Sequence, residues 1–199
     1  MGRFIGPRTK VCRRLNFMIF DNANVQKAFL KREQDGMRRK QSEYGRRLLE
    51  KQKVMHYYGM RERQMRKCFD IARRTKGNTG KAFLILLERR LDNAVFSAGF
   101  GVSRFQARQM IAHGNVRVNG KRVDIASFLV SPGDTITFAD RPGVRKLVKE
   151  VLQRKSGYEA PDWIAVDPKS MTAKVVRLPV REDCRLPVND QLVVEFYSR

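Results

Sequence analysis

Apolar residues recur at helical spacing in two neighbouring stretches, residues 43–58 and 61–75. The first stretch has its apolar positions at Leu48, Met55 and Tyr58. The second has them at Met65, Cys68, Phe69 and Ala72. A spacing of three or four residues puts side chains on one helix face, and a glycine follows each stretch closely. We therefore predict two amphipathic helices.

A third helix is predicted over residues 80–91, with Thr79 as its cap and a dense apolar face that belongs to a core. Residues 91–98 continue or restart this helix, and the glycines of residues 99–101 break it. Ser103 and Gln106 have the spacing of a capping box, in which each side chain satisfies a backbone N–H. The pattern predicts a short helix that ends at His113 and is closed by Gly114.

Alternation of apolar and polar residues replaces the helical period after this point. Residues 116–118 predict a strand, Asn119-Gly120 predicts a tight hairpin turn, and the return strand begins at residues 121–123. Strand-like runs follow at residues 135–138, 174–178 and 192–197, and residues 143–155 predict an amphipathic helix. The predicted fold class is α+β, a helical domain followed by an inserted helix–hairpin module and C-terminal strands.

Residues 1–41 show weak periodicity and many turn signals, and they end in the basic cluster Arg38-Arg39-Lys40. We predict four segments. They are an extended basic arm (1–42), a helical region (43–90), a small α+β module (91–155) and a C-terminal segment that packs back on the earlier parts (156–199).

The chain carries 42 Lys and Arg against 20 Asp and Glu, a formal net charge of +22. Residues 1–80 contribute +15 of this excess and residues 81–199 contribute +7. Such an excess opposes compaction, so a polyanionic partner is expected, with nucleic acid first and an anionic membrane second. Around the predicted helix of residues 61–75 the only acids are Glu62 and Asp70, which favours a phosphate-binding surface over a solvated one.

Several other classes of protein find little support. No apolar run approaches the ~18 residues of a membrane-spanning helix, and the N-terminus has neither a signal region nor a good transit peptide. Cys12, Cys68 and Cys184 lie too far apart to suggest a disulfide framework. No phosphate-binding loop is present, and we expect no catalytic residue, no metal, no cofactor, no small-molecule substrate and no membrane partner.

The start of the predicted short helix and the basic hairpin together suggest a phosphate-binding platform. Ser103 offers free backbone N–H groups at the helix start, with Arg104, Arg108 and Gln109 nearby. The hairpin adds Arg117, Asn119, Lys121 and Arg122. The alternative is a stable α/β unit whose basic rim is merely solvated.

Residues 91–138 resemble the small RNA-binding module found in the fourth protein of the bacterial small ribosomal subunit and in some RNA-modifying and tRNA-charging enzymes. The family pattern appears as Ser103-Arg104, Ala107-Arg108, His113-Gly114 and Val118-Asn119-Gly120. The segments MGRFIGP, SEYGRRLLEKQKVMHYYG, RERQMRK, KGNTG, LLERRLDN and LVVEFYSR also resemble that ribosomal protein family. The resemblance runs from end to end of the chain.

The resemblance implies a structural protein of the small ribosomal subunit, in the cytoplasm or an organelle interior. It implies direct binding at a helix junction in the 5′ domain of the rRNA, early in assembly. It also implies a place beside the third and fifth proteins where mRNA enters, with effects on translational accuracy, and Arg38, Arg39 and Lys40 match that mRNA-contacting segment. Many members bind zinc through four cysteines, but Thr9 occupies one of these positions, so a zinc-free arm is expected.

The residues expected to bind rRNA are basic or polar and come from the predicted helices and the hairpin. They are Arg13, Arg14, Arg46, Arg47, Lys51, Lys53, Arg63, Arg66, Lys67, Arg73, Arg74, Lys76, Ser103, Arg104, Arg108, Gln109, His113, Asn119, Lys121 and Arg122. The rival classes are an enzyme, a binder of stalled ribosomes or free tRNA that uses the same module, and a membrane-surface protein. An RNA-modifying enzyme would need a further catalytic domain of perhaps ~200 residues.

Overall fold

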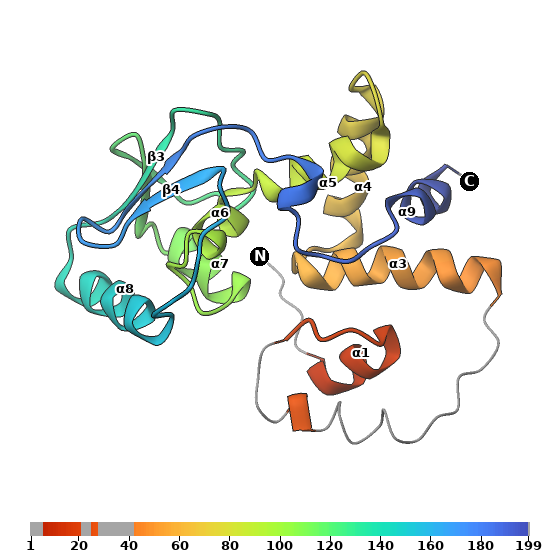
Figure 1. The fold of residues 1–199 in the computed structure, drawn as a ribbon, viewed down its shortest axis with the longest axis horizontal. Helices are drawn as coiled ribbons and strands as arrows, with labels where there is room; N and C mark the ends of the chain where they lie inside the picture. Colours follow the sequence, from red (N-terminus) through yellow and green to blue (C-terminus); the bar gives the residue numbers. More distant parts are fainter. Residues whose placement is uncertain (1–5, 21–24, 28–41, 199) are drawn as a thin grey trace. The chain divides into compact units, whose positions relative to one another are not determined.

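The computed structural model describes residues 6–20, 25–27 and 42–198, and it divides the chain into two compact units (Figure 1). The first unit combines Met1–Gly80 with Leu186–Arg199, and the second comprises Lys81–Arg185. The boundary near Gly80 falls within helix α5 (Thr79–Glu88). The first unit is therefore built from both ends of the chain, and the second from one continuous segment.

The first unit is helical in its described part. It contains the helices α1 (Arg8–Leu15), α3 (Glu43–Tyr57), α4 (Glu62–Arg74) and α9 (Asp190–Tyr197), and residues 25–27 are helical as well. The Ser42 hydroxyl caps α3 by accepting the backbone N–H of Gly45 at 3.1 Å. The predictions of helices at 43–58 and 61–75 are confirmed.

Helix α9 packs along α3 and is also bonded to α4. The Arg47 Nε donates to Glu195 Oε2 at 2.7 Å, and the backbone N–H of Asn189 donates to Glu50 at 3.0 Å. The Tyr197 ring stacks on Phe69 of α4 with centroids 4.8 Å apart, and its hydroxyl donates to Glu62. These bonds and this stack tie residues from the end of the chain to residues near its beginning.

Two predictions for the ends of the chain are wrong. Residues 192–197 form part of helix α9 rather than a strand, because the Asn189 side chain caps the helix and α3 buries its apolar face. The part of the predicted extended arm at Arg8–Leu15 is helix α1, in which Val11, Cys12 and Leu15 are buried together. Burial of apolar side chains within the first unit stabilises both helices.

The second unit begins with most of helix α5 and continues as two layers, a five-stranded antiparallel sheet and three further α-helices. The strands are β1 (Val116–Val118), β2 (Lys121–Val123), β3 (Thr135–Phe138), β4 (Ile164–Asp167) and β5 (Thr172–Val175), in the order β2-β1-β3-β5-β4. The helices are α6 (Leu91–Ser97), α7 (Arg104–Ala112) and α8 (Pro142–Arg154). They share one apolar core with the inner face of the sheet, and Trp163 is fully buried in it. This arrangement confirms the α+β class.

The elements predicted between residues 91 and 138 are present. The Ser103 hydroxyl accepts the backbone N–H of Gln106 at 3.2 Å, and the Gln106 side chain accepts the N–H of Val102 rather than that of Ser103. Asn119 and Gly120 have φ angles of 51° and 77°, as the tight hairpin requires. Strand β4, which was not predicted, completes the sheet beyond β5.

Candidate nucleic-acid interface

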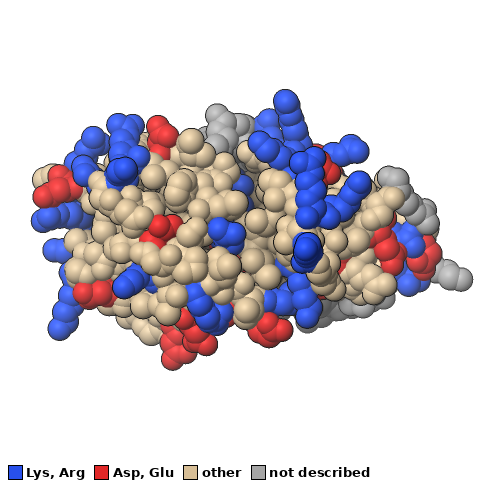
Figure 2. Space-filling view, turned by 90° about the horizontal axis from the view of Figure 1, so that it is seen from above, with Lys and Arg blue, Asp and Glu red and all other residues tan. Residues whose placement is uncertain are grey.

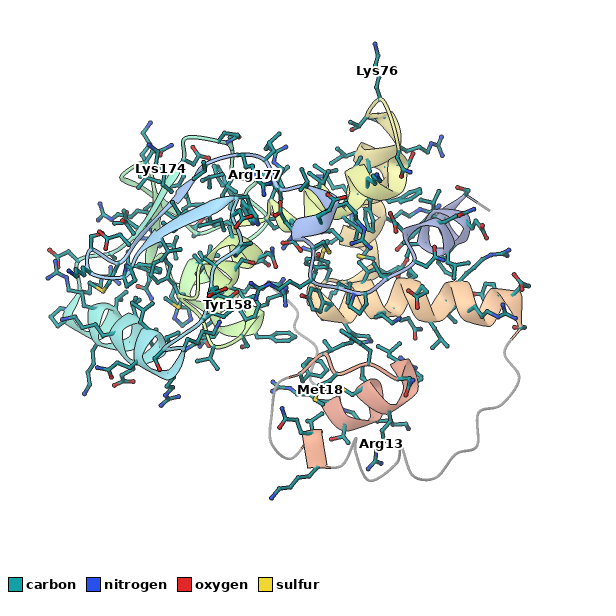
Figure 3. The ribbon with its side chains drawn as sticks, viewed as in Figure 1. Arg13, Met18, Lys76, Tyr158, Lys174 and Arg177 are labelled. Carbon is teal, nitrogen blue, oxygen red and sulfur yellow. The ribbon has the colours of Figure 1, made fainter. Side chains whose placement is uncertain are left out.

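The outer side of α4 and the turn after it carry a dense group of cations. Arg63, Arg66, Lys67, Arg73, Arg74 and Lys76 are exposed. Within the described part of the chain, none of these six side chains forms an ion pair or a hydrogen bond. Lys76 extends away from the end of α4 (Figure 3). We call these six residues the α4 cationic face.

The buried side of α4 explains why these cations all remain outside. Met65, Phe69 and Ala72 are at most 2% exposed and face the interior of the first unit. The helical period then leaves ten positions of α4 on the outer side, and five of these are Arg or Lys against two acids. An uncompensated cationic helix face of this kind is suited to bind phosphate groups.

Other predicted rRNA-binding cations in the first unit already have partners within the chain. Arg47 contacts Glu195, Lys53 contacts Glu50, and the Lys51 ammonium lies 2.6 Å from Glu62 and 4.8 Å from the centre of the Phe196 ring. Lys51 is only 7% exposed. These three residues help to hold α3 in place, and an RNA-binding role for them stays a prediction.

Three further predicted positions in this unit, and His56, which was not predicted, differ in their surroundings. Arg13 and Arg14 are exposed on α1, and Figure 3 shows Arg13 pointing away from the helix. Arg46 is exposed and lies 3.6 Å from Glu43. His56 is buried, and burial together with Arg14 and Lys51 lowers the pKa of its imidazole. The predicted mRNA-contacting residues Arg38, Arg39 and Lys40 lie outside the described residues.

In the second unit a buried carboxylate holds two arginines. The Asp92 side chain is 2% exposed and accepts from Arg90 Nε at 3.0 Å and from Arg108 Nε at 2.8 Å. The Nη2 groups of both arginines also donate to it. A fully bonded buried ion pair of this kind fixes the arrangement of α6 and α7.

Asn93 extends this network to the start of α7. Its Nδ2 donates to the backbone oxygen of Glu88 at 3.1 Å, and its Oδ1 accepts from Arg104 Nε at 2.8 Å. The Arg104 guanidinium also lies 4.4 Å from the centre of the Phe96 ring. Arg104 and Arg108 are therefore both held by bonds within the chain, and their role towards phosphate stays a prediction.

We predicted a phosphate-binding platform in which the hairpin lies beside the start of α7. The structure places the hairpin elsewhere. The Arg122 guanidinium covers Gly114, where an added Cβ would lie 2.2 Å from its Nε. Gly114 follows the C-terminal end of α7, roughly 15 Å along the helix from Ser103 at 1.5 Å per residue. Arg122 therefore belongs to the opposite end of α7. Its own exposure and that of Lys121, Gln109 and His113 remain compatible with RNA contacts.

The Asn119 side chain joins the hairpin turn to the segment that begins β3. Its Nδ2 donates to Asp134 at 2.8 Å, and its Oδ1 accepts the backbone N–H of Thr135 at 2.9 Å. These two bonds fasten the turn to the start of β3. The amide is committed to them, so any contact of Asn119 with RNA stays a prediction.

The described residues contain no group of three or more His, Cys, Asp and Glu side chains arranged to hold a metal ion. Cys12, Cys68 and Cys184 form no disulfide bonds, and the Cys12 side chain, on the inner side of α1, is fully buried. Among the described helices none is long and apolar enough to cross a membrane.

A surface rich in exposed cations, with acidic groups in smaller numbers between them, is plain in the space-filling view (Figure 2). Together with the α4 cationic face and the basic helix–hairpin module, it defines the class of the molecule as an RNA-binding protein.

Comparison with known proteins gives the family. Residues 3–88 match the family "Ribosomal protein S4/S9 N-terminal domain", and residues 89–136 match the "S4 domain". The chain is 44% identical to small ribosomal subunit protein uS4 of Thermus thermophilus and 43% identical to that of Aquifex aeolicus, over 100% of both chains in each case. The uS4 protein of Phytoplasma australiense is 45% identical, again over both full lengths. The chain belongs to the uS4 family of small ribosomal subunit proteins.

This membership confirms the family resemblance drawn from the sequence. The relatives are ribosomal proteins of the bacterial type and not enzymes, so the chain is not an enzyme, as expected.

Proposed function

We propose that this protein is a structural constituent of the small ribosomal subunit that binds the rRNA directly, in the ribosome of a cytoplasm or an organelle interior. One observation carries the proposal, namely the α4 cationic face, whose exposed cations have no partner in the described part of the chain. A-form RNA is recognised mainly through its backbone and shape, which a rigid row of cations on a helix fits.

The finer proposal is primary binding at a multi-helix junction in the 5′ domain, early in subunit assembly. A junction brings several phosphate backbones close together, and their repulsion opposes the compact arrangement. Cations spread over α4 would reduce that repulsion and favour one arrangement of the arms. Binding at such a site would let the protein nucleate the folding of the surrounding RNA.

We further propose a place near the site where mRNA enters the subunit, beside the third and fifth small-subunit proteins, with an effect on translational accuracy. Support comes from the family resemblance of the segment that holds Arg38, Arg39 and Lys40. These three residues lie outside the described residues, so the proposal rests on the sequence.

Chemical footprinting tests the rRNA proposal. The full-length protein is bound to naked small-subunit rRNA at about 0.2 M salt, where nonspecific contacts fade, with unrelated structured RNA as competitor. We expect protection confined to the 5′ domain junction that survives the competitor. Diffuse protection that the competitor removes would reject the proposal and favour a binder of stalled ribosomes or tRNA. The same assay with tRNA as competitor then distinguishes a tRNA binder, whose protection tRNA removes, from a binder of stalled ribosomes.

A further inference from the structure

The sheet of the second unit has an inner face on the core and an outer face whose residues alternate with the core residues. Helices α6, α7 and α8 share the core with Val116, Ile136 and Val175, so all three lie on the inner side. The strand register fixes which outer residues are neighbours. Arg122, Arg117 and Thr137 form one row across β2, β1 and β3. Thr135, Lys174 and Ala165 form the next row across β3, β5 and β4.

The outer face is cationic. Arg117, Arg122 and Lys174 are exposed, and these two rows contain no acid. In the described part of the chain none of the three forms an ion pair, and the Arg117 guanidinium bonds only the backbone oxygen of Gly120. Lys174 lies on the side of the sheet away from α8 (Figure 3). Adjacent strands are only about 5 Å apart, so the three charges crowd a small area.

Arg117 and Arg122 lie directly opposite each other in the register of β1 and β2. Like charges in that position destabilise a strand pair, and a solvated sheet face normally mixes both signs. Among the residues of the five strands the only acid is Asp167, one row further on the same side, whose carboxylate accepts from Ser170 and from the backbone of Lys169. The repulsion on the outer face is therefore left for an external anion to relieve.

We propose that the outer face of the sheet is a second RNA-binding surface, separate from the α4 cationic face, that grips the phosphate backbone of another RNA segment. Arg117, Arg122 and Lys174 would contact phosphate oxygens, and the hydroxyls of Thr135 and Thr137 would bond sugar or phosphate. The two rows contain no aromatic side chain, so bases are not stacked on them and the surface reads backbone rather than sequence. This inference rests on the proposed rRNA binding.

The test compares two full-length variants that remove the same charge from the second unit. The sheet variant carries Arg117→Gln, Arg122→Gln and Lys174→Gln. The control variant carries Lys146→Gln, Lys149→Gln and Arg154→Gln, three exposed positions on α8. Binding to small-subunit rRNA is measured at several salt concentrations. We expect the slope of log affinity against log salt to fall by about 2 in the sheet variant, since each lost phosphate contact removes ~0.7. The control should keep the wild-type slope.

Footprints separate this surface from the α4 cationic face. A third variant with Arg63→Gln, Arg66→Gln and Lys67→Gln should lose protection at one set of nucleotides, and the sheet variant at another. Equal slopes for the sheet and control variants would overturn the inference, as would loss of the same nucleotides in both the sheet and α4 variants. Absence of any selective protection by the wild-type protein would instead reject the proposed function.

A fourth variant is needed in case the sheet variant fails to fold, because Arg122 also covers Gly114. The double variant Arg117→Gln with Lys174→Gln leaves Arg122 in place and should lower the slope by about 1.4, at ~0.7 per contact. Unfolding curves of each variant show which comparison is valid. If the triple variant unfolds, the double variant decides, and a wild-type slope for it overturns the inference.

Discussion

The arginines of α4 and those around Asp92 have the same chemistry in different surroundings. On α4 the cations stand outside a helix whose other side is packed, and they have no partner in the described part of the chain. At the junction of α6 and α7, Arg90 is buried and Arg108 is largely buried, with side chains 4% and 13% exposed, and both donate to Asp92. Where the chain supplies the carboxylate, the arginine holds the fold. Where it does not, the arginine is available for the proposed contact with RNA.

Substitution of Asp92 should give the largest effect. Asp92→Ala takes the carboxylate away from the buried Arg90 guanidinium and removes the same partner from Arg108. Removing one partner of a buried pair costs about 3–5 kcal/mol. Trp163, the single tryptophan of the chain, is buried in the core of the same unit, so its fluorescence during urea unfolding reports this loss. The control is Asp140→Ala, which removes an exposed pair with Arg145 and should cost less than about 1 kcal/mol. Similar losses in both variants would contradict the comparison.

A double comparison within the first unit comes next. The α4 variant, with Arg63→Gln, Arg66→Gln and Lys67→Gln, should lower the salt slope of RNA binding by about 2 and leave stability nearly unchanged. The second variant removes the same charge from α3 with Arg47→Gln, Lys51→Gln and Lys53→Gln. It should destabilise the helical unit by about 1–3 kcal/mol, because Lys51 is buried. Helix unfolding by circular dichroism and RNA titrations measure the two effects. If the α3 variant loses the salt slope instead, those residues bind phosphate as the sequence suggested.

Arg122 lies between these two groups, since it is exposed but packs on Gly114. Substitutions of two glycines test whether its position matters for RNA binding. Gly114 and Gly120 both have positive φ angles, so alanine at either should cost about 1 kcal/mol or slightly more. Only at Gly114 does the new Cβ displace the Arg122 guanidinium, since nothing lies within 4 Å of the Cβ position at Gly120. We therefore expect Gly114→Ala to weaken RNA binding severalfold more than Gly120→Ala at similar stability. Equal RNA affinities would show that the position of Arg122 is unimportant.

The smallest effect concerns a titratable group among the cations of the first unit. Burial, Arg14 and Lys51 lower the folded-state pKa of His56 below its ordinary value of 6.5. Between those two pKa values the unfolded chain binds more protons than the folded chain. The contribution of the neutral His56 to the free energy of unfolding is therefore fully present above pH 6.5 and is lost as the pH falls below that value. His56→Gln should remove this part of the pH dependence. Parallel stability curves for variant and wild type between about pH 5 and 8 would contradict the prediction.

Local signals in the sequence predicted much of this fold. The hairpin at Asn119-Gly120 and the cap at Ser103 follow from residue types that satisfy backbone groups within a few positions. The ends of the chain depend on distant contacts instead. The run LVVEFY favours a strand by composition, yet packing on α3 and the cap at Asn189 make it a helix.

The candidate site divides in the same way. The α4 cationic face could be predicted because the helical period shows which cations lie opposite the apolar stripe. That Arg108 shares the Asp92 carboxylate with Arg90 could not, since the two arginines are far apart in sequence and their burial comes from the packing of α6 on α7. The outer sheet face was missed because Lys174 joins Arg117 only through the pairing of β3 with β5.

The division of the chain has a consequence for how the protein emerges during synthesis. Domains generally fold in the order in which they leave the ribosome. Here the continuous second unit, Lys81–Arg185, is complete while the last residues of the chain are still unmade. Helix α9 and its cap Asn189, which bond Arg47, Glu50 and Glu62, are translated after the second unit. The α4 cationic face is therefore translated early, and the helical unit that carries it is completed only with the final helix.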